Sequence, residues 1–404
     1  MIAFSRFRKN ILSTTSWLSN GSIVLKKYVH KNINFIPRHV LIVSKVSRYQ
    51  VERIRESQLS DDDFKRYMIE RGTDYQRMVE THEKNKNVQE QVVKTLKKLN
   101  IQYILKNRLT IEKFDFDWAD FVISIGGDGT FLLAANLIFD NKKPVIGINS
   151  DPDMSEGYLM LDRYFTNNIS RIFDKLKNGE FEYLMRTRIR VTLEGDGIWG
   201  VPFHMHEKAR ICGQEIFCTN DKSAEAQKTR RLPWLALNEV FIGESLSART
   251  SSLKIKINDS NDYYQVKSSG VCVSTGTGSS SWYRAINSMT TQMLRDIVQF
   301  VDPNKNYTDE EADKICNQFN ESLLFPPDDL AMSYAIRDII MNEIWPLPKK
   351  INPRDFCNKL TIKSQCYDAG LVFDGGIGIP FNMDTTAILE THPEDKLRTI
   401  KFLD

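Results

Sequence analysis

The segment Gly126-Gly127-Asp128-Gly129-Thr130 is the first place where residue types and spacing indicate chemistry. Apolar residues flank it at 121–125 and 131–135, so we predict a turn between a strand and a helix. Glycines let a backbone approach a ligand closely, and the free N–H groups that open a helix attract anions. An aspartate repels phosphate unless a metal or a reacting hydroxyl lies between them. Asp128 therefore suggests a base or a metal-side ligand, with Thr130 as the helix N-cap. An ordinary strand-to-helix turn is the alternative.

Asn238 and Glu239 interrupt the apolar run at residues 235–242, which is otherwise typical of a buried strand. Neighbouring strand residues point to opposite faces, so at least one of the two polar side chains faces a buried or ligand-lined surface. Leaving it there without a partner would cost roughly a few kcal/mol. The pair is a candidate for ligand binding. The alternative is a strand end or bulge whose polar groups are satisfied internally.

A strand at residues 271–274 is predicted to run into a turn rich in glycine and hydroxyl groups, which is followed by Trp282 and Tyr283. Hydroxyls and free N–H groups in such a turn can hold phosphate or ribose, and Trp282 offers a flat surface to a base. A flexible Ser/Gly linker is the alternative, although linkers rarely stand between an apolar strand and aromatic residues.

The first half of the chain must position the glycine turn. Apolar strands are predicted at residues 39–45, 101–105, 121–125 and 144–149, and long helical patterns fill residues 61–99. Strands that alternate with helices predict a parallel sheet with right-handed crossovers. In such sheets ligands bind beyond the carboxyl ends of the strands, and the glycine turn follows one of them.

The second half changes character. From about residue 180, short β-rich runs separated by turns predict an all-β domain, and helical stretches at residues 291–300 and 309–325 interrupt it. We therefore expect an α/β domain with a Rossmann-like parallel sheet, followed by an all-β domain with a helical insertion. The expected parts are a mitochondrial targeting peptide at residues 1–37, the α/β domain at 38–175, the all-β domain at 176–385 with the insertion at about 288–350, and a C-terminal segment at 386–404 that returns to the α/β domain.

Composition places the chain among ordinary globular proteins, because 41% of its 404 residues are hydrophobic and 26% are charged. No apolar stretch approaches the ~18 residues that span a bilayer, so we expect no membrane partner. Residues 1–37 contain no acid and include apolar residues among their serines and basic residues, which is typical of a peptide for import into the mitochondrial matrix. A disordered basic tail is the alternative. The basic residues are Arg6, Arg8, Lys9, Lys26, Lys27 and Lys31.

Other candidate sites are set aside. The six cysteines form no C-x-x-C pair, so we expect reduced thiols and no protein-bound metal. A net charge of +3 gives no reason to expect a nucleic-acid partner. Neither a P-loop nor a G-x-G-x-x-G dinucleotide motif occurs. His204-Met205-His206-Glu207 and residues 208–231 are predicted to be polar loops, and Asp374-Gly375-Gly376 is predicted to be a hairpin turn.

Taken in order, the glycine turn, the Asn238-Glu239 pair and Thr275-Gly276-Thr277-Gly278-Ser279 resemble the three signature motifs of the NAD kinases. The similarity extends from about residue 39 to the C-terminus. The flanking residues at 147–157, 237–249 and 267–282 are similar to the mitochondrial branch of that family in animals.

The resemblance implies that the all-β domain is a nucleotide-binding β-sandwich and that the active site lies between it and the α/β domain. It also implies that the γ-phosphoryl group of ATP, with Mg²⁺, is transferred to the 2′-hydroxyl of the adenosine ribose of NAD, which gives NADP. Asp128 matches the family's proposed base. A homodimer is expected, because the helical insertion offers a surface to a partner. The expected substrate-binding residues are Gly126, Gly127, Gly129, Thr130, Asn149, Asn238, Glu239, Arg249, Lys267, Ser269, Thr275, Gly278, Ser279, Ser280, Ser281, Trp282 and Ala285.

The chain departs from the common family pattern at three places. Ser269 stands where many relatives have Asp, Gly276 stands in place of Pro, and Ser280-Ser281-Trp282 replaces Thr-Ala-Tyr. We therefore expect the dinucleotide contacts and regulation to differ there. Two other functions remain as alternatives, a kinase with the same glycine turn that acts on another hydroxyl acceptor and a non-catalytic NAD(H)-binding sensor.

Overall fold

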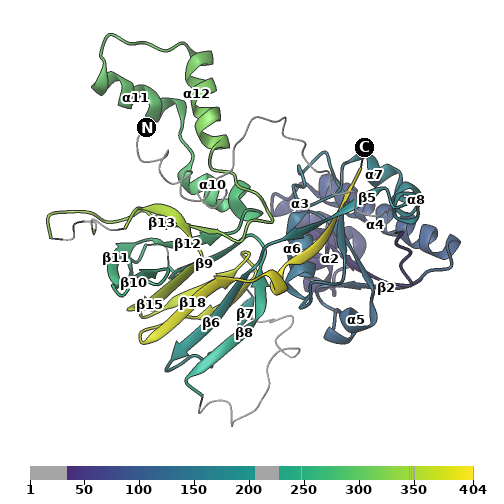
Figure 1. Ribbon diagram of the computed structural model, residues 1–404. Coiled ribbons are helices and arrows are strands. Elements are labelled where there is room, and N and C mark those ends of the chain that lie inside the picture. The colour runs from purple at the N-terminus through teal and green to yellow at the C-terminus, as the bar shows by residue number, and fades with distance from the viewer. Residues whose placement is uncertain are drawn as a thin grey trace, which may run out of the picture. The chain divides into compact units, whose positions relative to one another are not determined.

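The computed structural model describes residues 34–204, 227–246, 248–344, 346, 348 and 351–403, and Asn34–Asp404 forms one compact unit (Figure 1). Most of the expected targeting peptide lies outside the described residues. The same holds for most of the polar loop expected at 208–231 and for three residues of His204-Met205-His206-Glu207. No helix in the described ranges is both long enough and apolar enough to cross a bilayer.

A six-stranded sheet forms the α/β half, and its strand order is β2-β1-β3-β4-β19-β5. The pairs β1–β2, β1–β3 and β3–β4 are parallel, which confirms the predicted parallel sheet. β19 pairs with β4 only at Thr399 and Val145, and β5 is antiparallel to β19. The strands are β1 (His39–Ser44), β2 (Gln102–Asn107), β3 (Phe121–Gly126), β4 (Val145–Asn149), β5 (Phe181–Arg186) and β19 (Leu397–Phe402).

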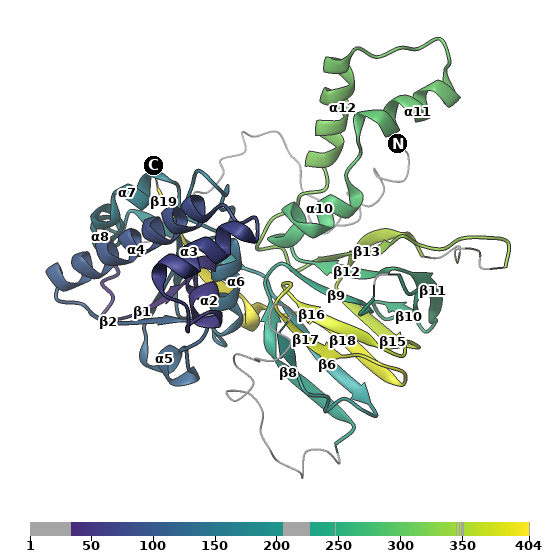
Figure 2. The same cartoon turned by 180° about the vertical axis from the view of Figure 1, so that it is seen from behind.

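Helices cover both faces of this sheet, which explains why every residue of β3 and β4 is buried. α4 packs Val88 and Val92 against one face, in a core that includes Ile42. α6 packs Phe131 against the other face, in a core that includes Leu41. Figure 2 shows α2, α3 and α4 together. The helices are α2 (Arg48–Arg55), α3 (Asp61–Glu70), α4 (Tyr75–Lys98), α5 (Lys113–Trp118), α6 (Asp128–Asn136), α7 (Tyr164–Asn167) and α8 (Ile169–Asn178).

Two antiparallel sheets form the β half, and side chains from both share one apolar core, which confirms the predicted all-β architecture. The first sheet contains β11 (Tyr264–Ser268), β10 (Ser251–Ile257), β15 (Lys359–Ser364), β18 (Thr385–Thr391), β6 (Ile189–Gly195) and β8 (Thr229–Ala236), in that order. The second contains β14 (Arg354–Cys357), β13 (Met332–Arg337), β12 (Gly270–Ser274), β9 (Glu239–Glu244), β16 (Ala369–Phe373), β17 (Ile377–Pro380) and β7 (Phe203–His204).

Three helices lie between β12 and β13. They are α10 (Trp282–Asn287), α11 (Thr291–Val301) and α12 (Asp309–Glu321), and the chain returns to the second sheet at β13. α11 and α12 contact each other through a small core of Leu294, Ala312 and Cys316. Thr308 caps α12 by accepting a hydrogen bond from the Glu311 N–H, as expected for a threonine before an acidic first turn.

Arg188 joins the two halves. Its buried guanidinium donates hydrogen bonds to the carbonyl oxygens of Ala135 at 3.0 Å and Ile138 at 2.6 Å, near the end of α6, and to that of Asp395 at 2.6 Å. Unpaired carbonyls at a helix C-terminus attract a cation. Burial lowers the pKa of Arg188 to about 10, so the side chain stays charged at neutral pH and holds α6 against β6.

Candidate active site

The glycine turn connects β3 to α6, as predicted, but its cap differs. The N-cap is Gly127 and Asp128 is the first helical residue, so the prediction that Thr130 is the N-cap is wrong. Gly126 must be a glycine, because a Cβ there would lie 2.5 Å from Thr130 Oγ1 and 2.9 Å from Lys45 Cβ. A Cβ on Gly129 would meet nothing within 4 Å. The backbone is therefore tightly packed at Gly126 and open at Gly129. On the open side a ligand can approach the first N–H groups of α6.

Main-chain groups orient the carboxylate of Asp128. Its Oδ1 accepts a hydrogen bond from the Leu159 N–H at 2.9 Å, and its Oδ2 accepts one from the Tyr158 N–H at 3.1 Å. A carboxylate oxygen can accept two hydrogen bonds, so each keeps one acceptor position. Asp128 is thus held in one orientation and can still accept a proton from a hydroxyl group.

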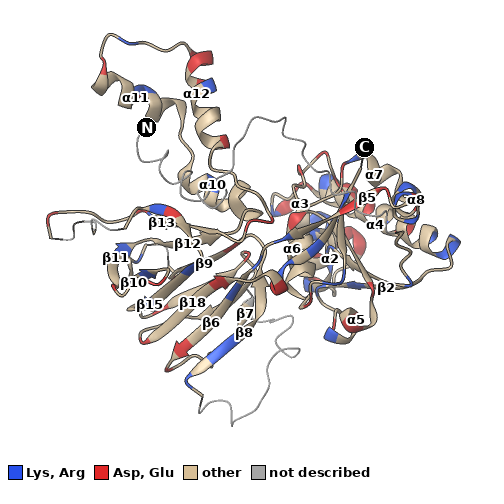
Figure 3. Ribbon diagram, in the orientation of Figure 1, with Lys and Arg blue, Asp and Glu red and all other residues tan. Residues whose placement is uncertain are grey.

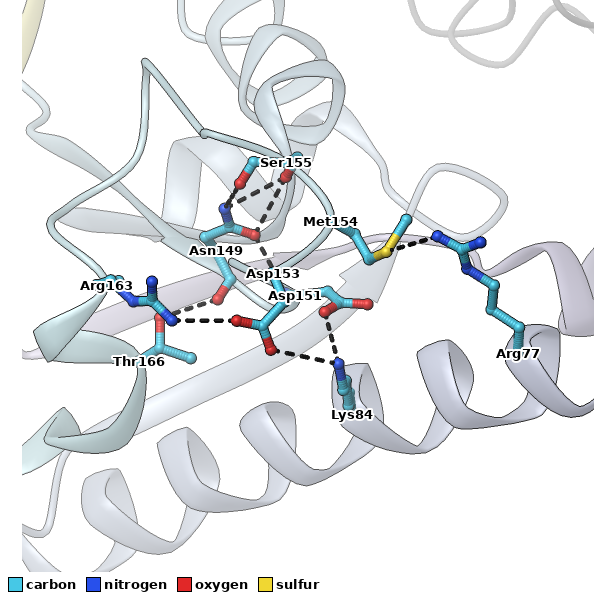
Figure 4. Close-up of polar contacts among 9 residues, drawn as sticks. All are labelled: Arg77, Lys84, Asn149, Asp151, Asp153, Met154, Ser155, Arg163 and Thr166. Atoms are coloured by element: carbon cyan, nitrogen blue, oxygen red, sulfur yellow. Dashed lines mark hydrogen bonds and ion pairs between the residues drawn. The ribbon is translucent and has the colours of Figure 1, made fainter.

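Asn149 shapes the loop that supplies these N–H groups. Its Nδ2 donates to the Ser155 carbonyl at 2.9 Å, and its Oδ1 accepts from the Asp151 N–H at 3.1 Å (Figure 4). Gly157 has φ +68°, and a Cβ there would lie 2.7 Å from Asn149 Nδ2. The structure therefore places the buried side chain of Asn149 under the loop at residues 150–157, in contact with the protein itself.

An ion-pair cluster fixes the same loop to α4 (Figure 4). Lys84 Nζ lies 2.8 Å from Asp151 Oδ1 and 3.7 Å from Asp153 Oδ2, while Arg163 Nη2 lies 3.0 Å from Asp153 Oδ1. Asp151 is buried, and its hydrogen bond raises the pKa of Lys84. Sequence patterns missed this cluster, because Lys84 and Asp151 are far apart in the chain. The orientation of Asp128 thus depends indirectly on α4, through this loop.

The Asn238-Glu239 pair lies at a break between two strands. The single strand predicted at residues 235–242 is wrong, because β8 ends at Ala236 in one sheet and β9 begins at Glu239 in the other. Leu237, at the break, is buried in the core beside α6. Asn238 and Glu239 therefore stand where the chain crosses between the sheets and touches the α/β half.

Asp374 holds this break in place. Its carboxylate accepts hydrogen bonds from the main-chain N–H groups of Leu237 at 2.9 Å, Asn238 at 2.7 Å and Glu239 at 3.1 Å. It also accepts one from Asn136 Nδ2 of α6 at 3.1 Å. The predicted hairpin turn is correct, since Asp374 lies between the antiparallel strands β16 and β17. The sequence did not reveal that the same side chain ties the two halves together.

Asn238 and Glu239 are each only 7% exposed, and two of their acceptor atoms have no hydrogen-bond partner among the described residues. These atoms are Asn238 Oδ1 and Glu239 Oε2. Burial, and then the charge of Asp374, raise the pKa of Glu239 to about 8. Burial also raises the pKa of Asp374 to about 6, against the effect of its N–H donors. Because unpaired buried polar atoms are costly, the pair is suited to a ligand that carries hydroxyl or amino groups.

The turn at residues 275–279 packs directly against the break. A Cβ on Gly278 would lie 2.1 Å from the Asn238 carbonyl oxygen, so only glycine fits there. The Thr275 N–H donates to the same carbonyl at 2.9 Å. The Ser279 hydroxyl donates to the Gly276 carbonyl at 2.7 Å and accepts from the Phe325 N–H at 3.3 Å. The buried hydroxyls of this turn therefore stabilise its own conformation.

The residues that follow are more accessible. Ser281 is exposed and its hydroxyl lies 3.4 Å from Asn238 Nδ2. Ser280 is half-buried and contacts the Thr277 carbonyl at 3.4 Å, and Ala285 is exposed on α10. Trp282 stacks on Phe241 with ring centroids 4.4 Å apart, so one of its faces is covered by the protein. Of these residues, Ser281 is the one that contacts Asn238 at the break.

The other predicted binding residues are Lys267, Ser269 and Arg249, which lie toward the far end of the paired strands β9 and β12. At the near end Ser274 pairs with Glu239, and at the far end Val271 pairs with Ile242. Lys267 and Ser269 precede this second end, and the exposed Arg249 lies near Glu244, with Arg249 Nη1 and Glu244 Oε2 4.0 Å apart. A strand rises about 3.3 Å per residue, so the structure does not bring these three together with Glu239.

A cavity of about 380 Å³ lies beside the glycine turn. Gly127, Gly129 and Thr130 line it on one side, and Asp374 and Lys45 are among its other lining residues. Arg108 also lines this cavity, so two basic side chains reach it. Lys45 directly follows β1 at the carboxyl end of the sheet, and that position is a signal by which the sequence could have identified it. The cavity combines open glycines with positive charge, which suits phosphate groups.

Comparison with known proteins agrees with this geometry. A family model described as the ATP-NAD kinase N-terminal domain matches residues 23–153. "NAD kinase 2, mitochondrial" of Homo sapiens is 37% identical over 377 residues, covering 91% of this chain and 84% of that protein. The protein of the same name from Xenopus tropicalis is 34% identical over 395 residues, covering 92% of each.

A solved structure supports the fold. A crystal structure described as yeast NADH kinase complexed with NADH has a TM-score of 0.50, is 13% identical, and covers 90% of this chain and 83% of that one. The resemblance predicted from three short motifs is confirmed by the sequence comparisons. With 37% identity across 91% of its length to a mitochondrial NAD kinase, the chain belongs to the NAD kinase family, whose members are phosphotransferases with an alcohol group as acceptor.

Proposed function

We propose that this protein transfers the γ-phosphoryl group of ATP to the 2′-hydroxyl of the adenosine ribose of NAD and so makes NADP in mitochondria. Two features together carry the proposal. One is Asp128, an oriented carboxylate at an open helix N-terminus. The other is the pair of buried, unpartnered acceptors on Asn238 and Glu239. Asp374 connects the two, because it contacts both α6 and the β8–β9 break.

The reaction needs one proton acceptor and several groups that stabilise negative charge. The carboxylate of Asp128 takes the proton of the 2′-hydroxyl as the new O–P bond forms and the bond from the γ-phosphorus to ADP breaks. The N–H groups at the start of α6 face the transferred group. Lys45 and Arg108, which line the neighbouring cavity, are suited to the remaining phosphates of ATP.

Mg²⁺ fits this site as a companion of ATP. Within the described ranges no three His, Cys, Asp or Glu side chains form a metal site. Mg²⁺ usually binds substrate phosphates with one or two protein carboxylates, and Asp128 is a carboxylate at the phosphate-binding turn. When bound, Mg²⁺ would neutralise part of the phosphate charge.

Replacing Asp128 with asparagine is expected to abolish most NADP formation, by roughly 100-fold or more, because the amide cannot take the hydroxyl proton. The measurement is NADP formed from NAD, ATP and Mg²⁺ by the purified protein. Asp117→Asn, which changes an exposed acid of α5, is the matched control and is expected to retain wild-type turnover. Circular dichroism of Asp128→Asn would establish that the fold is kept.

The same assay separates the other candidate functions. Near wild-type turnover by Asp128→Asn would exclude its role as the base. NAD binding without NADP formation by the wild-type protein would favour a sensor. Neither binding nor product would favour a kinase that acts on another hydroxyl acceptor.

Glu239 gives the protein a pH-dependent stability. Its raised pKa of about 8 means that the folded protein keeps a proton that the unfolded chain releases, so stability falls as pH rises toward 8. The slope from one such group is at most about 1.4 kcal/mol per pH unit. Asp374, whose pKa is raised to about 6, titrates largely below the range of roughly pH 6.5 to 8 in which Glu239 is tested.

Glu239→Gln is expected to remove that slope, because glutamine mimics the protonated form at every pH. The free energy of unfolding of the ligand-free protein would be measured by urea denaturation between roughly pH 6.5 and 8. Glu83→Gln, at an exposed position of α4, serves as the control and should keep the wild-type slope. Equal slopes in wild type and Glu239→Gln would refute the assignment.

The mitochondrial matrix is the proposed location. It is supported by the acid-free, basic residues 1–37 and by the names of the relatives, which include the word mitochondrial. Residues 1–40 fused to a fluorescent reporter are expected to direct it to the matrix in cells. A diffuse cytosolic signal would contradict this proposal.

A homodimer is proposed on the basis of α11. Most of this helix is tan in Figure 3. Its charged residues are Arg295 and Asp296, while Ile297 is 53% and Phe300 90% exposed. Such an apolar face is suited to a second copy of the chain. Light scattering of the wild type should give about twice the chain mass, and Ile297→Glu with Phe300→Glu should give the monomer. A monomeric wild type would rule the dimer out.

A further inference from the structure

Arg186 ends β5 and lines a cavity of about 470 Å³. The same cavity is lined by Gly147 of β4 and by Leu159 and Met160 of the segment that follows the loop at residues 150–157. β4 and β19 pair only at Val145 and Thr399, and the cavity lies where these strands separate. Arg186 is half-buried in this wall.

The guanidinium of Arg186 lacks the partners that its neighbours have. Arg188 donates to several main-chain carbonyls, and Arg190 forms ion pairs with Asp395 at 2.6 Å and Glu394 at 3.0 Å. Arg186 Nη1 donates to Thr277 Oγ1 at 3.3 Å, and among the described residues no carboxylate lies within 4 Å of the Arg186 side chain. A half-buried cation without an acidic partner is less stable than a paired one, and an anionic ligand would supply the missing partner.

Two contacts place this cation beside the reaction centre. The N–H of Leu159, which lines the same cavity, binds the carboxylate of Asp128. Thr277, the partner of Arg186, belongs to the turn that packs on the Asn238 carbonyl. Burial lowers the pKa of Arg186, and the charge of Asp128 opposes that effect. Arg186 is therefore linked to Asp128 through the cavity wall at Leu159, and to the β8–β9 break through Thr277.

We propose that Arg186 binds the phosphoryl group during transfer and then the 2′-phosphate of the NADP product. This rests on the proposed function. The O–P bond to the 2′-oxygen forms, the bond to ADP breaks, and the hydroxyl proton goes to Asp128, while Arg186 neither gains nor loses a proton. A guanidinium offers a planar set of donors that matches phosphate oxygens, and such charge-assisted hydrogen bonds are strong where water is excluded.

The test compares the affinities for NADP and NAD, which differ only in the 2′-phosphate. Isothermal titration calorimetry without ATP measures both ligands on the wild type, Arg186→Met and Arg186→Lys. For Arg186→Met, the proposal expects NADP binding to weaken by roughly 10- to 100-fold and NAD binding to change by less than about threefold. Arg186→Lys keeps the charge and is expected to recover part of the NADP affinity.

Lys401→Met is the matched control, because Lys401 lines the same cavity but pairs with Glu182 at 3.3 Å. It should leave the ratio of the two affinities unchanged. An equal loss for both ligands in Arg186→Met, or no loss for NADP, would overturn the proposal even if the wild type makes NADP. A wild type that binds neither dinucleotide would instead defeat the proposed function, and the role of Arg186 with it.

Discussion

The carboxylate of Asp374 is the interaction on which the arrangement of the active site depends. It binds three successive main-chain N–H groups where the chain passes from β8 to β9, and it also binds Asn136 of α6. Without such an acceptor the break would leave buried N–H groups unpaired, at the cost of about 1–3 kcal/mol each. Because α6 starts at Asp128, the same contact sets the position of the β8–β9 break relative to Asp128, the proposed base.

Electrostatics explains why the site is prepared for a ligand. Burial and Asp374 raise the pKa of Glu239, so this carboxyl keeps its proton near neutral pH and can donate as well as accept. The amide of Asn238 has an unpaired oxygen beside it. Positive charge is supplied separately, by Lys45 and Arg108 in one cavity and by Arg186 in the other. In the proposed reaction, these neutral acceptors would face the hydroxyl-bearing part of the substrate, and the cations would face its phosphates.

The sequence predicted what depends on neighbouring residues. Alternating apolar runs gave the parallel sheet, and the glycine turn identified Asp128 at the end of β3. Prediction from the sequence failed where a contact links positions that are distant in the chain. Residues 235–242 read as one strand, because the break is stabilised by Asp374, more than a hundred residues away. The cap was misassigned because Gly127, which has no side chain, takes the position that Thr130 was expected to fill.

A carboxylate that acts as a base must be oriented and must keep an acceptor position for the proton, and the surroundings of Asp128, the proposed base, meet both requirements. Orientation comes from the N–H groups of Tyr158 and Leu159, whose loop is fixed by Asn149 and by the Lys84–Asp151 ion pair. None of these groups occupies the remaining acceptor positions of Asp128. These partners use two acceptor positions of the Asp128 carboxylate, and in the proposed reaction the other two serve the hydroxyl group.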